Sequence, residues 1–176
     1  MHHSLEELHA DYARLLANLA SETLEIHPAN DAGCWNVRQI VEHLTLTYRS
    51  SASVLQKRLD KGRPTQTRPT LKQRGPRLVV LWLGFMPRGQ IAPSMVAPGA
   101  DAGSLVDGAA LADIMRAELQ RMDELLTLCE RQFGSQQMAT HQVLGPLSAS
   151  QWRRFHVTHG RHHLKQMRRL GLSERA

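Results

Sequence analysis

The chain has 176 residues, 41% of them hydrophobic, and a formal net charge of +6, which is typical of one soluble domain, so we expect a single domain over residues 1–176. The longest apolar run, Leu78–Met86, excludes a membrane-spanning helix, which needs about 20 apolar residues, and we expect no membrane partner. The N-terminus carries acids where a secretory signal would need apolar residues, so we expect no export. Cys34 and Cys129 form no C-x-x-C pair, so we expect a cytoplasmic protein with unpaired thiols.

Hydrophobic residues recur at helical spacing in four long segments, and no segment alternates as a strand would. The four predicted helices are Leu5–Leu24, Val37–Asp60, Gly108–Phe133 and Ala149–Leu170. Four amphipathic helices of this length predict an all-α four-helix bundle. The connection between the second and third helices, residues 61–107, is too long for a hairpin. We therefore expect a long crossover, with a short helix around Leu78–Phe85 laid across the bundle.

Polar residues and glycines mark the predicted ends of these helices. The predicted N-terminal caps are Ser4 with Glu7, Asn36 with Gln39, Asp107, and Ser148 with Gln151. The predicted C-terminal stops are Gly62, Gly134 and Gly171.

The excess of positive charge lies on the crossover. Residues 61–103 contain seven lysines and arginines, one acid and six prolines. A basic loop attracts phosphate groups and acidic ligands. The aromatic side chains are not interleaved with the basic ones, as a platform for stacked bases would require. We therefore favour a solvated surface segment and expect no nucleic-acid partner.

The fourth helix crowds four of the ten histidines into residues 156–163. At about 100° per residue, His156, His159 and His163 point within about 40° of the direction of Trp152, which is the apolar side. The same projection places Arg153 and the other arginines and lysines of this helix on the solvent side. His162 falls on the border between the two sides.

Two imidazoles four residues apart on an inward face can direct their nitrogens at one point, as helical metal sites do. The alternative is a pair of hydrogen-bonded core histidines. A third ligand would favour the metal, and His43 flanks the apolar stripe of the second helix. From there its ring either reaches inward or stays half exposed, while His27 and His141 fall in predicted loops.

Two segments resemble a known family. The stretch "WNVRQIVEHL", Trp35–Leu44, resembles the second helix of the DinB-like (YfiT-like) metalloenzyme superfamily. The stretch "HGRHHLKQ", His159–Gln166, resembles that family's late H-x-x-x-H-x-x-Q signature. The form "HHLKQ" is most similar to an uncharacterised bacterial subgroup, and "FMPRGQIAPSMVAPG" is similar to the crossover of that subgroup.

The resemblance implies a four-helix bundle that holds one divalent metal through His43, His159 and His163. It places Gln166 in packing or in support of a ligand ring. Zinc or nickel is the expected metal, with iron or copper as alternatives, because imidazole suits all four. Characterised relatives include transferases and isomerases that use low-molecular-weight thiols, although no residue here matches a thiol-binding role.

Three neutral imidazoles would leave a coordination position open for water or a thiolate. The sequence therefore predicts a metal-dependent enzyme, either a thiol-dependent transferase or a hydrolase, acting on a small molecule. No catalytic acid or base is evident: Glu42, Glu118 and Asp123 lack support, and His156 and His162 are the better local candidates.

The alternative is a bundle that binds metal or a small ligand without catalysis, with its site closed by a fourth ligand such as His156. Members of the family often pair, and the segment Leu78–Met86 with Trp82 would form a large exposed patch on a monomer. We therefore expect a homodimer, unless this segment packs on its own bundle.

Overall fold

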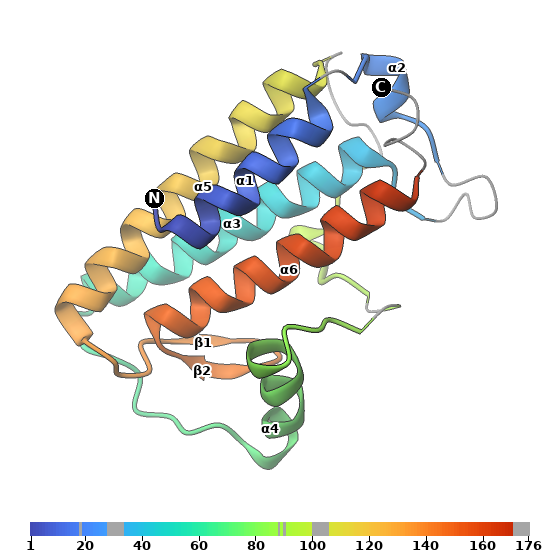
Figure 1. The fold of residues 1–176 in the computed structure, drawn as a ribbon. Coiled ribbons are helices and arrows are strands. Elements are labelled where there is room, and N and C mark those ends of the chain that lie inside the picture. Colours follow the sequence, from blue (N-terminus) through green and yellow to red (C-terminus); the bar gives the residue numbers. More distant parts are fainter. Residues whose placement is uncertain (18, 28–33, 88, 90, 100–105, 171–176) are drawn as a thin grey trace.

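Four long helices lie side by side in the computed structural model, which describes residues 1–17, 19–27, 34–87, 89, 91–99 and 106–170 (Figure 1). They are α1 (His3–Leu16), α3 (Val37–Asp60), α5 (Gly108–Phe133) and α6 (Ala149–Arg169). Helices α1 and α3 each pack against both α5 and α6, so the four enclose one core. The predicted all-α bundle with a long crossover between its second and third long helices is confirmed.

The apolar stripes of the four helices face one another in this core. Fully buried side chains include Tyr12 on α1, Leu44 and Tyr48 on α3, Met122 on α5 and Met167 on α6. Burying a large apolar side chain contributes about 1.5–3 kcal/mol. The core therefore holds α3 and α6 at a fixed separation, which matters because both helices carry histidines.

Most helix ends follow the predicted signals. The Asn36–Gln39 and Ser148–Gln151 capping boxes are both formed, and the Asp107 side chain accepts from the Ala110 N–H at 2.8 Å. The Ser4–Glu7 box is wrong, because the helix begins at His3, two residues earlier than predicted, and the His2 ring caps it. Gly134 follows α5 with φ of +60°, and Gly62 follows α3 with φ of +63°. Gly171 lies outside the described residues.

The first predicted helix, Leu5–Leu24, is wrong as one continuous element. Helix α1 ends at Leu16, and a separate short helix, α2 (Ser21–Leu24), follows. The start of α5 lies against this break: the Gly108 N–H donates to the Leu19 carbonyl at 3.3 Å. A Cβ on Gly108 would lie 2.0 Å from the Leu16 carbonyl oxygen, so only glycine allows this contact. A contact between distant segments therefore ends α1.

Residues 71–82 of the crossover form a helical arm, and the second part of this arm packs against α6. Helix α4 (Leu71–Arg77) continues into a π-helical turn, η1 (Leu78–Trp82), and a 3₁₀ turn, η2 (Ser94–Val96), follows. The predicted short helix at Leu78–Phe85 therefore begins earlier and ends earlier than expected. Val80 and Leu81 of η1 are buried, and the Thr158 hydroxyl of α6 donates to the Val80 carbonyl at 3.2 Å. The arm thus packs partly on its own bundle.

A small antiparallel ribbon contradicts the expectation of no strands. It pairs β1 (Ala139–His141) with β2 (Gly145–Leu147), directly before α6. The Arg77 guanidinium at the end of α4 donates to the carbonyls of Leu144 and Pro146 at 3.0 and 2.6 Å. Strands of three residues are too short to show an alternating pattern in the sequence.

Arg153 is buried, which contradicts its predicted place on the solvent side of α6. Its guanidinium donates to Asp123 at 2.7 Å, to Glu130 at 2.6 Å and to the Thr127 hydroxyl at 2.8 Å, all on α5. Burial opposes the charge, but the hydrogen bonds to the two carboxylates raise the pKa of Arg153. This ion pair fastens α6 to α5.

The two cysteines form no disulfide with each other, as predicted: Cys34 is exposed and Cys129 is buried. Among the described residues, no helix has the length and apolar character needed to cross a membrane.

We predict that Arg153→Ala lowers the free energy of unfolding by about 3–5 kcal/mol, because it leaves the Asp123 carboxylate buried without its cation. Urea unfolding followed by circular dichroism measures the change. Arg161→Ala, at an exposed position of the same helix, is the matched control and should change the value by less than about 0.5 kcal/mol. If both variants lose the same free energy of unfolding, the buried ion pair contributes no more to stability than an exposed arginine does.

Candidate metal centre

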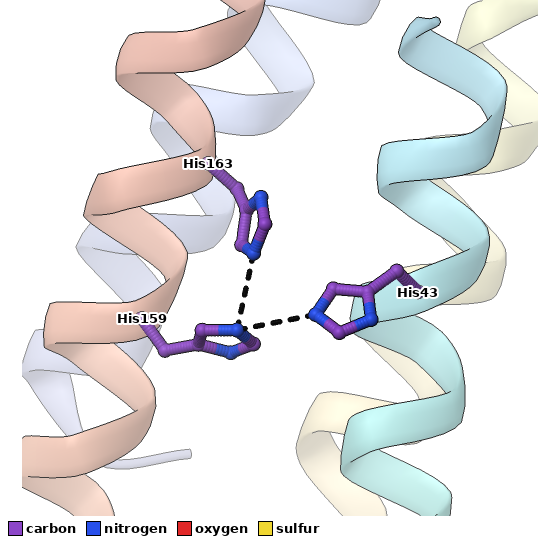
Figure 2. Close-up of side chains that lie close together, drawn as sticks. All are labelled: His43, His159 and His163. Carbon is purple, nitrogen blue, oxygen red and sulfur yellow. Dashed lines mark hydrogen bonds between the residues drawn. The ribbon is translucent and has the colours of Figure 1, made fainter. Parts of the chain in front are cut away.

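Helices α3 and α6 direct three imidazole rings at one point between them. His159 and His163 project from successive turns of α6, and His43 projects towards them from α3 (Figure 2). The Nε2 atom of His159 lies 3.2 Å from that of His43 and 3.1 Å from that of His163. One ligand atom from each ring lies within 4.8 Å of the others. The structure thus brings together the three histidines that the sequence singles out.

The backbone of the crossover orients the His43 ring. His43 is buried on α3. Of the two positions that the sequence left open, its ring therefore takes the inward one and is not half exposed. Its Nδ1–H donates to the Val96 carbonyl in η2 at 2.7 Å. With the proton on Nδ1, the Nε2 atom presents a lone pair to the point between the helices.

Gln166 orients the His163 ring in the same way. The Nδ1–H of His163 donates to the Gln166 side-chain oxygen, one turn further along α6, at 2.6 Å. This again leaves a lone pair on Nε2, directed at His159. The two rings therefore hold the tautomer that a metal ligand needs.

Two aromatic rings pack against the cluster. The Trp35 ring lies 4.8 Å from the His43 ring and 6.3 Å from the His163 ring, centroid to centroid. The Phe155 ring stacks on His159 at 5.4 Å, with an angle of 9° between the ring planes. Such apolar walls raise the cost of a charged imidazole.

The three imidazoles are therefore neutral at physiological pH. Burial lowers the pKa of His43, and burial together with the neighbouring rings holds the pKa of His159 well below its usual range. Burial, with smaller contributions from His43 and His162, lowers the pKa of His163 to about 3. Neutral imidazole is the form that binds a metal ion, so no proton has to be displaced from a charged ring.

The donor set fits a divalent transition metal. Ligand nitrogens about 2.0–2.1 Å from a tetrahedral zinc ion lie about 3.3–3.4 Å from each other. The spacings of 3.1 and 3.2 Å from His159 to its two neighbours are close to that value. Without an ion, the Nε2 of His159 faces the Nε2 lone pairs of His43 and His163, and it can donate its single hydrogen to only one of them. A cation would interact with all three nitrogens.

The acids considered from the sequence are engaged elsewhere. One oxygen of Glu42 accepts from the Gly99 N–H at 3.2 Å, and Glu118 forms an ion pair with Arg49 at 2.8 Å. Asp123 accepts from Arg153, as described above. None of the three belongs to the cluster that the described residues form.

His156 and His162 also lie outside the cluster. His156 is fully buried, and its ring packs against Tyr48 and Trp152, at 5.5 and 5.9 Å between centroids. His162 is half buried, with its ring 5.2 Å from that of His163. The geometry therefore offers no fourth histidine to close the site.

Sequence reasoning missed three contributions to this centre. The Val96 carbonyl is a backbone group, which carries no signal in the side-chain pattern. Trp35 enters the sequence analysis only as the first residue of a motif, and Phe155 does not enter it. Their places against the rings follow from the packing of α3 on α6, which the pattern of one helix does not contain.

We predict that the metal-free protein loses stability as the pH falls from 6.5 towards 4. Burial lowers the pKa of His156 to about 3 and that of His141 to about 4, whereas both titrate near 6.5 in the unfolded chain. At a pH between the folded and the unfolded pKa, these histidines are protonated in the unfolded chain and neutral in the folded chain. Acid therefore favours unfolding. Each histidine lowers the free energy of unfolding by up to about 1.4 kcal/mol per pH unit.

Urea unfolding with a chelator present, at pH 7, 6 and 5, measures this slope. The variant His156→Leu should show a shallower slope, because one of the buried histidines with a lowered pKa is gone. A free energy of unfolding that stays constant between pH 7 and pH 5 would contradict the buried neutral state of these rings.

Comparison with known proteins identifies the family of the chain. The chain matches the family model described as the DinB superfamily over residues 4–167, which include His43, His159 and His163. Searches of the curated proteins and of the solved structures found no match. The "HHLKQ" subgroup is not distinguished by the family match and stays a prediction. The chain belongs to the DinB superfamily.

Proposed function

We propose that the chain is a metal-dependent enzyme whose divalent ion is held by His43, His159 and His163. The observation that carries this proposal is the convergence of three buried, neutral imidazoles, with no fourth ligand residue in the cluster among the described residues. Catalytic zinc sites hold the ion by three protein ligands and leave a position for water or substrate. Zinc and nickel are the metals we favour, with iron or copper as alternatives.

A divalent ion at this point supplies Lewis acidity, which lowers the pKa of a bound water or thiol. The residues of the chain prepare the site for that chemistry. The Val96 carbonyl and Gln166 hold two ligand rings with their Nε2 lone pairs facing inward. Trp35 and Phe155 place apolar surface against the rings, and an apolar environment strengthens electrostatic interactions.

The reaction we propose is transfer of a low-molecular-weight thiol to an electrophile, or hydrolysis of a small substrate. Support for thiol chemistry comes from the resemblance of "WNVRQIVEHL" and "HGRHHLKQ" to family motifs. A second candidate is a bundle that binds a metal or a small ligand without catalysis. The contacts of Glu42, Glu118 and Asp123 favour it, because none of these three carboxylates belongs to the cluster in the described part of the chain.

We also propose that the chain is a single domain that pairs as a homodimer in the cytoplasm. The exposed Leu83 and Phe85 after η1 support an apolar contact between copies, and two cysteines that form no disulfide with each other suit a reducing compartment. Size-exclusion chromatography with light scattering should give twice the mass of the chain at about 50 µM. A strict monomer at that concentration would remove the dimer.

We predict that the purified protein binds one zinc or nickel ion per chain at neutral pH, measured by calorimetry. His159→Ala should abolish stoichiometric binding, because it removes the central nitrogen of the three. His156→Ala should keep binding, since His156 lies outside the cluster. Loss of binding in both variants would favour the closed, structural site. If the unaltered protein binds none of zinc, nickel, iron and copper, the metal proposal is wrong.

The enzymatic proposal is tested by assaying the zinc-loaded and nickel-loaded protein with a small thiol plus a chlorinated aromatic electrophile, and separately with an activated ester. We expect turnover with one of the two substrate classes. The rate should fall at least about 100-fold in His159→Ala, because the metal-activated nucleophile is lost. Arg161→Ala, on the exposed side of α6, is the matched control and should keep the rate. Stoichiometric metal binding without turnover on either class would favour the non-catalytic candidate.

A further inference from the structure

A hollow of about 570 Å³ lies beside the helical arm, away from the three histidines. It is lined by Arg68, Arg74 and Arg77, and by the apolar side chains of Leu78 and Trp82. None of its lining residues belongs to the candidate metal centre. Sites for small molecules have volumes of about 300–1,000 Å³, so the hollow has the size for one organic ligand.

The three arginines that line the hollow lack an acidic partner within the described residues. Elsewhere in the structure, arginines are paired with acids: these are Arg14, Arg38, Arg49, Arg116 and Arg153. Arg68 and Arg74 are exposed and form no ion pair with a described acid. The hollow therefore concentrates positive charge that no described carboxylate neutralises.

Arg77 shows that this arrangement is built into the fold. Its guanidinium is half buried and donates to three neutral oxygens: the carbonyls of Leu144 and Pro146, and the side chain of Gln151. These contacts fix its position between the arm, the ribbon and α6, but they do not cancel its charge. A fixed and uncompensated guanidinium is a favourable partner for an anion.

The other wall of the hollow is apolar. Trp82 is 73% exposed and Leu78 is 56% exposed, although both side chains are large and apolar. The Arg154 guanidinium lies over the Trp82 ring, 5.8 Å from its centroid, and so adds another cation beside the hollow. Seven of the thirteen exposed large apolar residues in the described part of the chain lie between Leu71 and Met95. Apolar and cationic surface thus occur together on this arm.

We propose that the hollow binds a small amphiphilic anion, a molecule that joins a phosphate or carboxylate group to an aliphatic or aromatic part. Arg68 and Arg74 bind the anionic group beside the fixed Arg77, and Leu78 and Trp82 pack against the apolar part. The site is independent of the metal centre, so it stands whether or not the chain is an enzyme.

The test measures the affinity of the full-length protein for hexyl phosphate by calorimetry. We expect saturable binding at one site per chain. The double variant Arg68→Gln/Arg74→Gln should raise the Kd at least about tenfold, because two charge-assisted contacts are lost. The matched control is Arg121→Gln/Arg131→Gln, which removes the same charge from exposed positions of α5 and should change the Kd less than about twofold.

Two further measurements separate the parts of the proposal. Inorganic phosphate should bind at least about tenfold more weakly than hexyl phosphate, because it lacks the part that packs on Leu78 and Trp82. Binding of hexyl phosphate should shift the fluorescence of Trp82, and Trp82→Leu should lose that shift.

Vesicles distinguish a free ligand from a lipid headgroup. If phosphatidylglycerol vesicles bind the unaltered protein and not Arg68→Gln/Arg74→Gln, while phosphatidylcholine vesicles bind neither, the anion belongs to a lipid. If hexyl phosphate binds and no vesicle does, the ligand is a free molecule. The proposal is overturned if neither probe binds saturably, if both double variants weaken binding equally, or if inorganic phosphate binds as tightly as hexyl phosphate.

Discussion

The burial of three imidazole rings between two facing helices is the constraint on which the account depends. A polar nitrogen removed from water is costly unless it finds a partner. The Val96 carbonyl and Gln166 satisfy the Nδ1 atoms of His43 and His163, so the remaining demand falls on the three Nε2 atoms at the centre and on the Nδ1 atom of His159, which has no hydrogen-bond partner among the described residues. The Nε2–H of His159 can donate to only one of the two lone pairs on His43 and His163. A divalent cation is the partner that satisfies all three nitrogens together.

The rest of the bundle keeps these rings in place. The Tyr12 hydroxyl of α1 donates to the Gly160 carbonyl at 2.6 Å, next to His159 on α6. A Cβ on Gly160 would lie 2.5 Å from the Leu8 side chain, so α1 and α6 approach closely at this level. Arg153 fastens the beginning of α6 to α5, and η2 holds the His43 ring from the other side. A ligand set needs this rigidity, because small shifts of the rings would separate the three nitrogens.

Much of this fold was predictable because it is encoded locally. Helices α3 and α5 begin and end where the caps and glycines predict, and the inward direction of His159 and His163 follows from the period of α6. The pattern of its own helix left the position of His43 open, and only the family resemblance predicted that it reaches inward. A side chain at the edge of an apolar stripe turns inward or outward according to what packs beside it.

The wrong predictions have the opposite origin, since each depends on contacts between distant segments. Helix α1 ends where the backbone of Gly108 lies against Leu16. Arg153 is buried because α5 offers it two carboxylates, which the projection of α6 alone does not reveal. The ribbon before α6 is held partly by Arg77 from the crossover, more than sixty residues earlier. Sequence periodicity describes one element at a time and contains none of these contacts.

The most direct measurement of the central claim is X-ray absorption spectroscopy on the zinc-loaded or nickel-loaded protein at neutral pH. It reports the number, type and distance of the atoms around the ion. The account predicts three imidazole nitrogens, at about 2.0–2.1 Å for zinc, and at least one further light atom that exchanges with added small ligands. A shell of four imidazoles, or a spectrum in which fewer than three are present, would contradict the open three-histidine centre.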